Sequence, residues 1–172
     1  LMAGKPMVLR VHHRHKNGSY RTLEINGKLH QYKGVKYIQS FVRDITDMLR
    51  AESALAESET RYKTIFEKAM VGIVITSVAG KIFNANTAFA NMLGYTISEI
   101  SRKNIQDLNI KEDLPKLEKI IYGIIRNETG NFEAKMYHKS GELRTIQVSA
   151  SRVRFGNEEF ILAFHWDITD ER

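Results

Sequence analysis

Histidines form the densest group of side chains in this sequence that could bind a metal or transfer protons. His12, His13 and His15 lie within four residues, and His30 follows on the next apolar segment. In an extended strand His13 and His15 share a face and His12 points away, so a metal ion would need a third ligand from His30 or from another chain. We therefore expect an exposed, titrating cluster and no metal site.

Catalytic chemistry has little support in the residue pattern. The chain contains no Cys, which excludes thiol catalysis, a Cys-ligated zinc site and a disulfide framework. It also contains neither a Gly-x-Ser-x-Gly nucleophile elbow nor a phosphate-binding P-loop. We predict that this chain has no catalytic residues and is not itself an enzyme.

The excess of positive over negative charge is confined to the first quarter of the chain. Residues 1–47 hold nine Lys and Arg against three acidic residues, and residues 48–172 hold seventeen of each. A basic nucleic-acid-binding protein is thus an alternative function, but charge in one segment fits a solvated strand surface better, and no nucleic-acid partner is expected. No apolar run approaches the roughly 18 residues of a membrane span, and no signal peptide is visible, so we expect a cytoplasmic protein without a membrane partner.

An internal repeat organises the elements that must position any site. Residues 15–47 align without a gap on residues 138–170, at a constant offset of 123, with eleven of 33 positions identical. The identities include a turn Gly, an Arg-Thr pair and a terminal Asp-Ile-Thr-Asp. The chain therefore reads as the tail of one domain followed by a complete second copy.

The second copy predicts an α+β domain. Segments 131–138, 143–154 and 159–167 are rich in β-branched and aromatic residues and are separated by Gly-containing turns, which predicts an antiparallel meander. Upstream, we predict strands at 71–76 and 81–84. Asn86 and Asp113 are the expected N-caps of two helices, and the second helix has an apolar stripe over 114–125. We expect a five-stranded antiparallel sheet with helices on one face.

Residues 47–69, between the copies, predict a long helix with a narrow apolar seam. Neither Gly nor Pro occurs there, and a 3-4 spacing runs from Met48 to Ala69. Leu55, Tyr62 and Ile65 are its largest apolar members. The seam fits a homodimer interface, and it fits equally well a helix that packs on the next sheet of its own chain.

Five short motifs resemble the PAS sensory-domain family. They are 61–73 (RYKTIFEKAMVGI), 80–86 (GKIFNAN), 93–100 (LGYTISEI), 138–141 (HKSG) and 167–169 (DIT). Thr76-Ser77 stands where the family often has Asp after the first strand. The five motifs occur in the family's order, and two of them recur at the offset of the repeat.

The resemblance implies three parts: 1–46 as the C-terminal strands of a preceding PAS domain, 47–69 as a helical linker, and 70–172 as a complete PAS domain. It implies a non-catalytic sensory and relay module of a multidomain cytoplasmic protein, dimeric, with a C-terminal output domain such as a histidine kinase. Three strands cannot bury both of their faces, so we expect residues 6–44 to pack against a second chain or the following domain.

The resemblance also bears on cofactors and on a ligand cavity. The missing Cys excludes flavin adduct photochemistry, and 113–127 contains no His, so haem bound from that helix is not expected. Several alternatives stay open for the space between sheet and helices. It could hold a small molecule, hold a non-covalent flavin in a redox sensor, hold no cofactor, or be a fully packed core. The expected cavity walls are Ile73, Ile75, Phe89, Met92, Leu108, Leu117, Ile121, Phe132, Ile146, Leu162 and Phe164, with Asn86, Asn91 and Tyr95 as the nearby polar groups.

Overall fold

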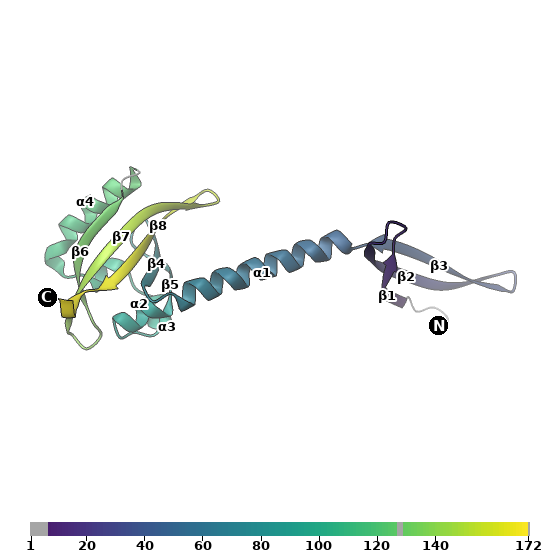
Figure 1. Cartoon of the computed structure of the whole chain (residues 1–172), viewed down its shortest axis with the longest axis horizontal. Helices are drawn as coiled ribbons and strands as arrows, with labels where there is room; N and C mark the ends of the chain where they lie inside the picture. The colour runs from purple at the N-terminus through teal and green to yellow at the C-terminus, as the bar shows by residue number, and fades with distance from the viewer. Residues whose placement is uncertain (1–6, 127–128, 172) are drawn as a thin grey trace. The chain divides into compact units, whose positions relative to one another are not determined.

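The computed structural model describes residues 7–126 and 129–171, which fall into two compact units (Figure 1). The first unit ends at Arg61 and the second begins at Tyr62. Helix α1 (Thr46–Lys68) contains this boundary. Each unit has its own sheet.

The first unit is a three-stranded antiparallel sheet in the order β1-β2-β3, followed by the start of α1. Its strands are β1 (Met7–Arg14), β2 (Tyr20–Tyr32) and β3 (Val35–Asp44). Lys33 and Gly34 form the turn between β2 and β3, with φ of 48° and 80°. Two consecutive residues with positive φ match the twist of the flanking strands in a tight hairpin.

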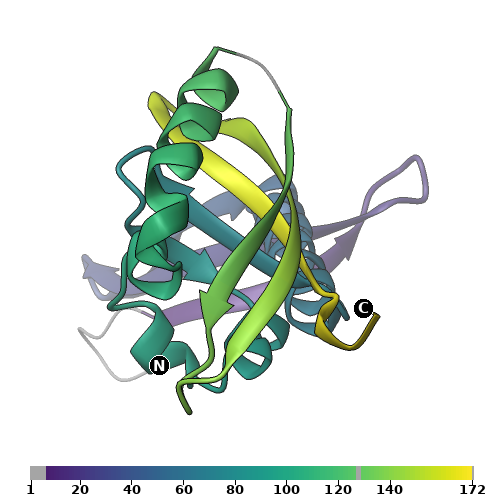
Figure 2. The same cartoon turned by 90° about the vertical axis from the view of Figure 1, so that its left-hand side faces the viewer.

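The second unit is a five-stranded antiparallel sheet with helices laid along one face (Figure 2). The strand order is β5-β4-β8-β7-β6. The strands are β4 (Gly72–Ser77), β5 (Ile82–Ala85), β6 (Gly130–Tyr137), β7 (Leu143–Phe155) and β8 (Glu158–Asp167). The helices are α2 (Thr87–Met92), α3 (Ile97–Ile100) and α4 (Leu114–Ile125), with single 3₁₀ turns η1 (Ile105–Leu108), η2 (Lys111–Asp113) and η3 (Thr169–Glu171). The predicted α+β fold is confirmed.

The two sheets repeat each other strand for strand. Adding 123 to the bounds of β1, β2 and β3 gives the bounds of β6, β7 and β8. The register repeats as well, because Leu23 pairs with Asp44 in the first unit and Ile146 with Asp167 in the second. The internal repeat found in the sequence is therefore a repeat of structure.

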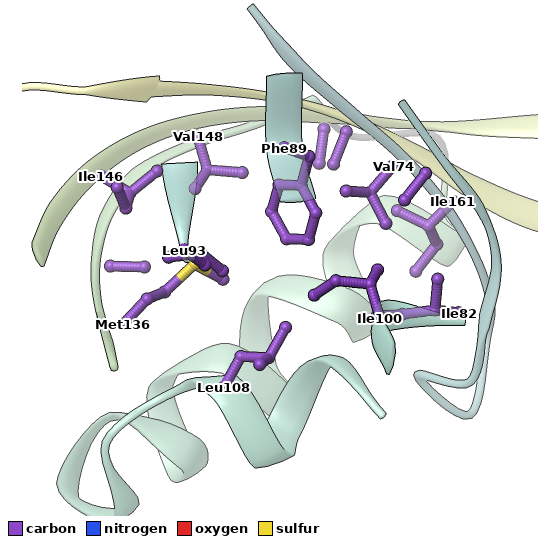
Figure 3. Packing of buried hydrophobic residues seen from close by; sticks show 14 of the residues in the cluster. Val74, Ile82, Phe89, Leu93, Ile100, Leu108, Met136, Ile146, Val148 and Ile161 are labelled. Carbon is purple, nitrogen blue, oxygen red and sulfur yellow. The ribbon is translucent and has the colours of Figure 1, made fainter. Parts of the chain in front are cut away.

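The core of the second unit lies between the sheet and the helices (Figure 3). Phe89 and Leu93 from the α2 segment and Ile100 and Leu108 from the following turns point toward the sheet and are almost completely buried. The sheet contributes Val74, Ala134, Met136, Ile146, Val148, Ala150, Ile161 and Ala163.

Helix α4 begins differently from the expectation. Asp113 occupies the N-cap position, but its backbone is helical and its side chain makes no capping hydrogen bond. The 3₁₀ turn η2 leads directly into α4, so Asp113 already lies inside a helical turn instead of in the extended conformation of a capping residue.

Candidate functional site

A small apolar cavity lies under α4 against the sheet and has a volume of about 50 Å³. Its walls come from α4, η1 and the core face of strands β4, β6, β7 and β8. The lining residues are Val74, Thr76, Ile105, Asn109, Leu117, Ile120, Ile121, Ile124, Phe132, Ala134, Met136, Val148, Ala150, Ile161 and Ala163. This cavity is the candidate ligand site.

Some of the predicted wall residues line the cavity or belong to the core around it, and others do not. Leu117, Ile121 and Phe132 line the cavity itself. Phe89, Leu108 and Ile146 belong to the same buried cluster, and Met92 and Tyr95 pack against it.

Four predicted wall residues face the other side of the sheet. Val74 and Thr76 on β4, and Ile161 and Ala163 on β8, point into the cavity. Because side chains alternate along a strand, Ile73, Ile75, Leu162 and Phe164 point to the opposite face. Their assignment to the cavity is therefore corrected. Both faces of these strands are apolar, so the alternation alone did not identify the inward one.

Thr76 and Asn109 are site residues that the sequence analysis did not select. Both are buried, with 6% of each residue exposed, and both line the cavity. Both are polar residues beside apolar segments: Thr76 follows an apolar strand segment, and Asn109 precedes the amphipathic helix. Polar residues at the ends of elements commonly serve turns, so their position alone does not mark a cavity wall.

Asn86 joins three elements through its buried side chain. Its Oδ1 accepts hydrogen bonds from Phe89 N on α2 (3.0 Å) and from Ile73 N on β4 (2.8 Å). Its Nδ2 donates to Phe66 O at the end of α1 (3.0 Å) and to Val71 O (2.9 Å). The predicted cap is thus present, and the same amide fixes the exit of α1 to the start of β4.

The other two predicted polar groups lie away from the cavity lining. Asn91 is exposed on α2. Tyr95 packs beside the core cluster, and its ring lies 4.9 Å from Lys103 Nζ and 5.8 Å from Lys139 Nζ. Tyr95 therefore contacts cations at the surface.

Both copies have the same pair of side-chain contacts between the end of the last strand and the neighbouring strand, which we call the clasp. Thr46 Oγ1 accepts from Thr22 N at 2.8 Å, and Thr169 Oγ1 accepts from Thr145 N at 3.0 Å. In each copy an Arg also reaches the Asp of the terminal motif, Arg21 to Asp44 at 2.6 Å and Arg144 to Asp167 at 3.3 Å. In the first copy the clasp leads directly into α1. The Asp-Ile-Thr motif is thus the junction between a sheet and the helical segment after it.

His165 is a fully buried imidazole on the core face of β8. Its ring packs against Phe89 at 4.8 Å between centroids, and its Nδ1 has no hydrogen-bond partner among the described residues. Burial lowers the pKa of His165 from 6.5 to about 4, against smaller opposing effects of the Gly72 and Ala163 backbone. His165 is therefore neutral at pH 7.

In the first unit His12, His13 and His15 are exposed and His30 is half-buried. Within residues 7–126 and 129–171, no three His, Cys, Asp or Glu side chains lie close enough together to hold a metal ion. His12 Nδ1 lies 3.2 Å from Thr22 Oγ1, and His30 stacks on Tyr37. In the same part of the chain, no helix is long and apolar enough to cross a membrane.

A flavin does not fit the cavity in this conformation. An apolar cavity of about 150 Å³ accommodates benzene, and the cavity here has about 50 Å³. The three-ring isoalloxazine is larger than benzene.

The fold is an antiparallel five-stranded sheet with helices on one face and a small cavity beneath α4. Residues 70–170 match the PAS domain family, and the chain belongs to that family. The resemblance drawn from the five motifs is confirmed.

Relatives and solved structures agree with this assignment. The chain is 25% identical over 123 residues to the sensor histidine kinase TmoS of Ectopseudomonas mendocina, covering 69% of this chain and 13% of that protein. It is 26% identical over 156 residues to sporulation kinase E of Bacillus subtilis, covering 91% and 20%. The crystal structure of the PAS domain of an HTR-like protein from Haloarcula marismortui aligns with a TM-score of 0.63 and 26% identity, covering 69% of this chain and 98% of that one.

Proposed function

We propose that this chain is a non-catalytic sensory relay module of a larger cytoplasmic signalling protein. A ligand in the cavity, or a partner, would alter the core face of the sheet. Asn86 would carry that change to α1, since one buried amide bonds Phe66 O, Val71 O and Ile73 N. This four-bonded amide is the observation on which the proposal rests.

The domain organisation and the output domain are part of the proposal. The common strand bounds and the repeated clasp support residues 1–46 as the last strands of a preceding PAS domain, 47–69 as a linker and 70–172 as a complete domain. Two of the similar proteins are named as kinases, and the chain spans 13% and 20% of their lengths. We propose a C-terminal histidine kinase as the output domain.

We further propose that α1 forms the contact of a homodimer. Leu55, Tyr62 and Ile65 are 61%, 54% and 65% exposed. Each apolar side chain stabilises an interface by about 1.5–3 kcal/mol when it is fully removed from water. Ser58 and two Ala in the seam weaken it, so the association is expected to be reversible.

Light scattering on the whole chain tests the dimer. Leu55→Asp with Ile65→Asp places two charges in the seam, and we expect this variant to be monomeric with the second unit still folded. Ser53→Asp with Thr60→Asp adds the same charges to the opposite side of α1 and is expected to stay dimeric. A monomer for the unmodified chain at tens of micromolar would contradict the proposed relay by helix packing.

The relay is tested by hydrogen exchange at the end of α1. Asn86→Asp keeps the acceptor oxygen but removes both donations of Nδ2, so we expect faster amide exchange around residues 66–73. Asn91→Asp, an exposed change on the same helix, is the matched control. Equal exchange in the two variants would show that Asn86 does not connect α1 to the sheet.

A further inference from the structure

Among the described residues, those that line the cavity under α4 include no ionisable side chain. Its walls are aliphatic and aromatic residues, together with Thr76 and Asn109. A charged group moved from water into such surroundings loses its hydration and gains no partner. The lining therefore selects against carboxylates, phosphates and ammonium groups.

Thr76 and Asn109 are the polar side chains of the cavity wall, and each residue is only 6% exposed. Asn109 Nδ2 donates to Ile105 O at 2.7 Å, and the amide Oδ1 can only accept a hydrogen bond. The Thr76 hydroxyl can both donate and accept. A polar ligand atom placed against this wall could therefore bond to either residue.

The volume limits the size of the occupant. About 50 Å³ is a third of the roughly 150 Å³ that accommodates the six carbons of benzene. Scaling by volume gives about two heavy atoms for the cavity as it stands, so a molecule of up to four requires the side chains of α4 to move slightly outward. Leu117, Ile120 and Ile121 on α4 are only half-buried, so an occupant would cover apolar surface that the protein leaves partly exposed.

We propose that the cavity binds a small uncharged molecule with an apolar body and one hydrogen-bonding group placed against Thr76 and Asn109. This inference rests on the proposed sensory function and names the ligand class for its site. Alcohols and ketones of a few carbons have this chemistry.

Three-carbon probes of different charge test the ligand class. We would titrate 1-propanol, propionate and propylammonium separately into the whole chain and follow the methyl NMR signals of Ala134, Ala150 and Ile161. Saturable shifts are expected for 1-propanol, with affinity on the order of millimolar for so few atoms, and none for the two ions. Equal binding of either ion, or no binding of 1-propanol, would overturn the proposal.

A hydroxyl-to-methyl replacement tests the polar contact. Thr76→Val keeps the shape and should weaken 1-propanol binding about two- to tenfold, the range of one net hydrogen bond, while xenon binding is retained. Retained xenon binding shows that the variant is folded around an intact cavity. Thr145→Val on the outer face of β7 is the control. Unchanged 1-propanol affinity in Thr76→Val would refute the contact.

The tests separate this inference from the relay. If 1-propanol binds as expected but Asn86→Asp leaves exchange in α1 unchanged, the ligand class stands and the relay fails. If no probe binds while Asn86→Asp accelerates exchange at residues 66–73, the ligand class fails and the relay stands.

Discussion

At the scale of single residues, Asn86 has the greatest structural consequence. Its side chain is completely buried and makes four hydrogen bonds to backbone atoms. A Ser or Asp at this N-cap would satisfy the amide of Phe89 but would lack the two amide donors for Phe66 O and Val71 O. An amide side chain therefore meets a requirement that goes beyond helix capping.

Asn86→Ala should reduce the free energy of unfolding of the second unit by roughly 3–5 kcal/mol. The change leaves buried backbone donors and acceptors without partners, each at a cost of about 1–3 kcal/mol, and partial hydration limits the sum. Urea unfolding followed by the fluorescence of Trp166 measures it. Asn91→Ala is the control, and a loss below 1 kcal/mol for Asn86→Ala would contradict this role.

His165 makes the second unit sensitive to mild acid. The pKa of His165 is lowered to about 4 in the folded chain. Between pH 6.5 and 4, His165 is therefore protonated in the unfolded chain and neutral in the folded chain. Stability therefore falls as pH drops from 6.5 to 4, by about 3 kcal/mol in total, and this group adds no further loss below pH 4. The hydrogen bond from Lys139 lowers the pKa of Glu99 from 4.5 to about 2. The stability that the charged Glu99 adds is therefore lost as the pH falls from 4.5 to 2.

Urea unfolding between pH 4 and pH 8 checks this prediction. His165→Leu should flatten the stability profile between pH 6.5 and 4. His13→Leu, a change of an exposed histidine on β1, should leave the profile of the second unit unchanged. The same slope in His165→Leu and the unmodified chain would show that His165 is already protonated or solvated in the folded state.

At the scale of elements, the terminal Thr of each copy fastens one strand to the next helical segment. Thr169→Val removes the acceptor of the partly buried Thr145 N–H, and Thr46→Val does the same to Thr22. Each change should destabilise its own unit by about 1–2 kcal/mol. Native-state hydrogen exchange resolves the two units, and Thr60→Val on exposed α1 is the control. If either substitution loosened both units equally, the clasps would not be local.

At the scale of the whole molecule, the first unit leaves an apolar sheet face uncovered within its own residues. Leu9, Ile38 and Val42 lie on the face that carries the core in the second copy, and Ile38 and Val42 are each 57% exposed. We predict that a second chain or the following domain covers this face, because such a patch is unfavourable in water.

Limited proteolysis tests this packing. Residues 7–44 should resist cleavage in the unmodified chain. In the monomeric Leu55→Asp, Ile65→Asp variant, faster cleavage would assign the cover to the second chain, and equal protection would assign it to the following domain. Rapid removal of residues 1–45, leaving a stable remainder from about residue 50, would show that the sheet is not packed at all.

The sequence by itself determined the elements and their order. The offset of 123 between the copies, the Gly-containing turns and the apolar spacing of each segment are local properties, and every strand and long helix they predict is present in the structure. Local signals suffice for these features because turn chemistry and side-chain periodicity act over a few residues.

Only the tertiary structure decided which residues meet at the site. Strands β4 and β8 are apolar on both faces, so alternation could not show that Thr76, Ile161 and Ala163 face the helices while Leu162 faces away. The four partners of Asn86 come from segments up to 20 residues distant, and the burial of His165 follows from Phe89 packing over it. Inward faces, buried polar contacts and cavities depend on how separate elements approach one another, which no short stretch of sequence contains.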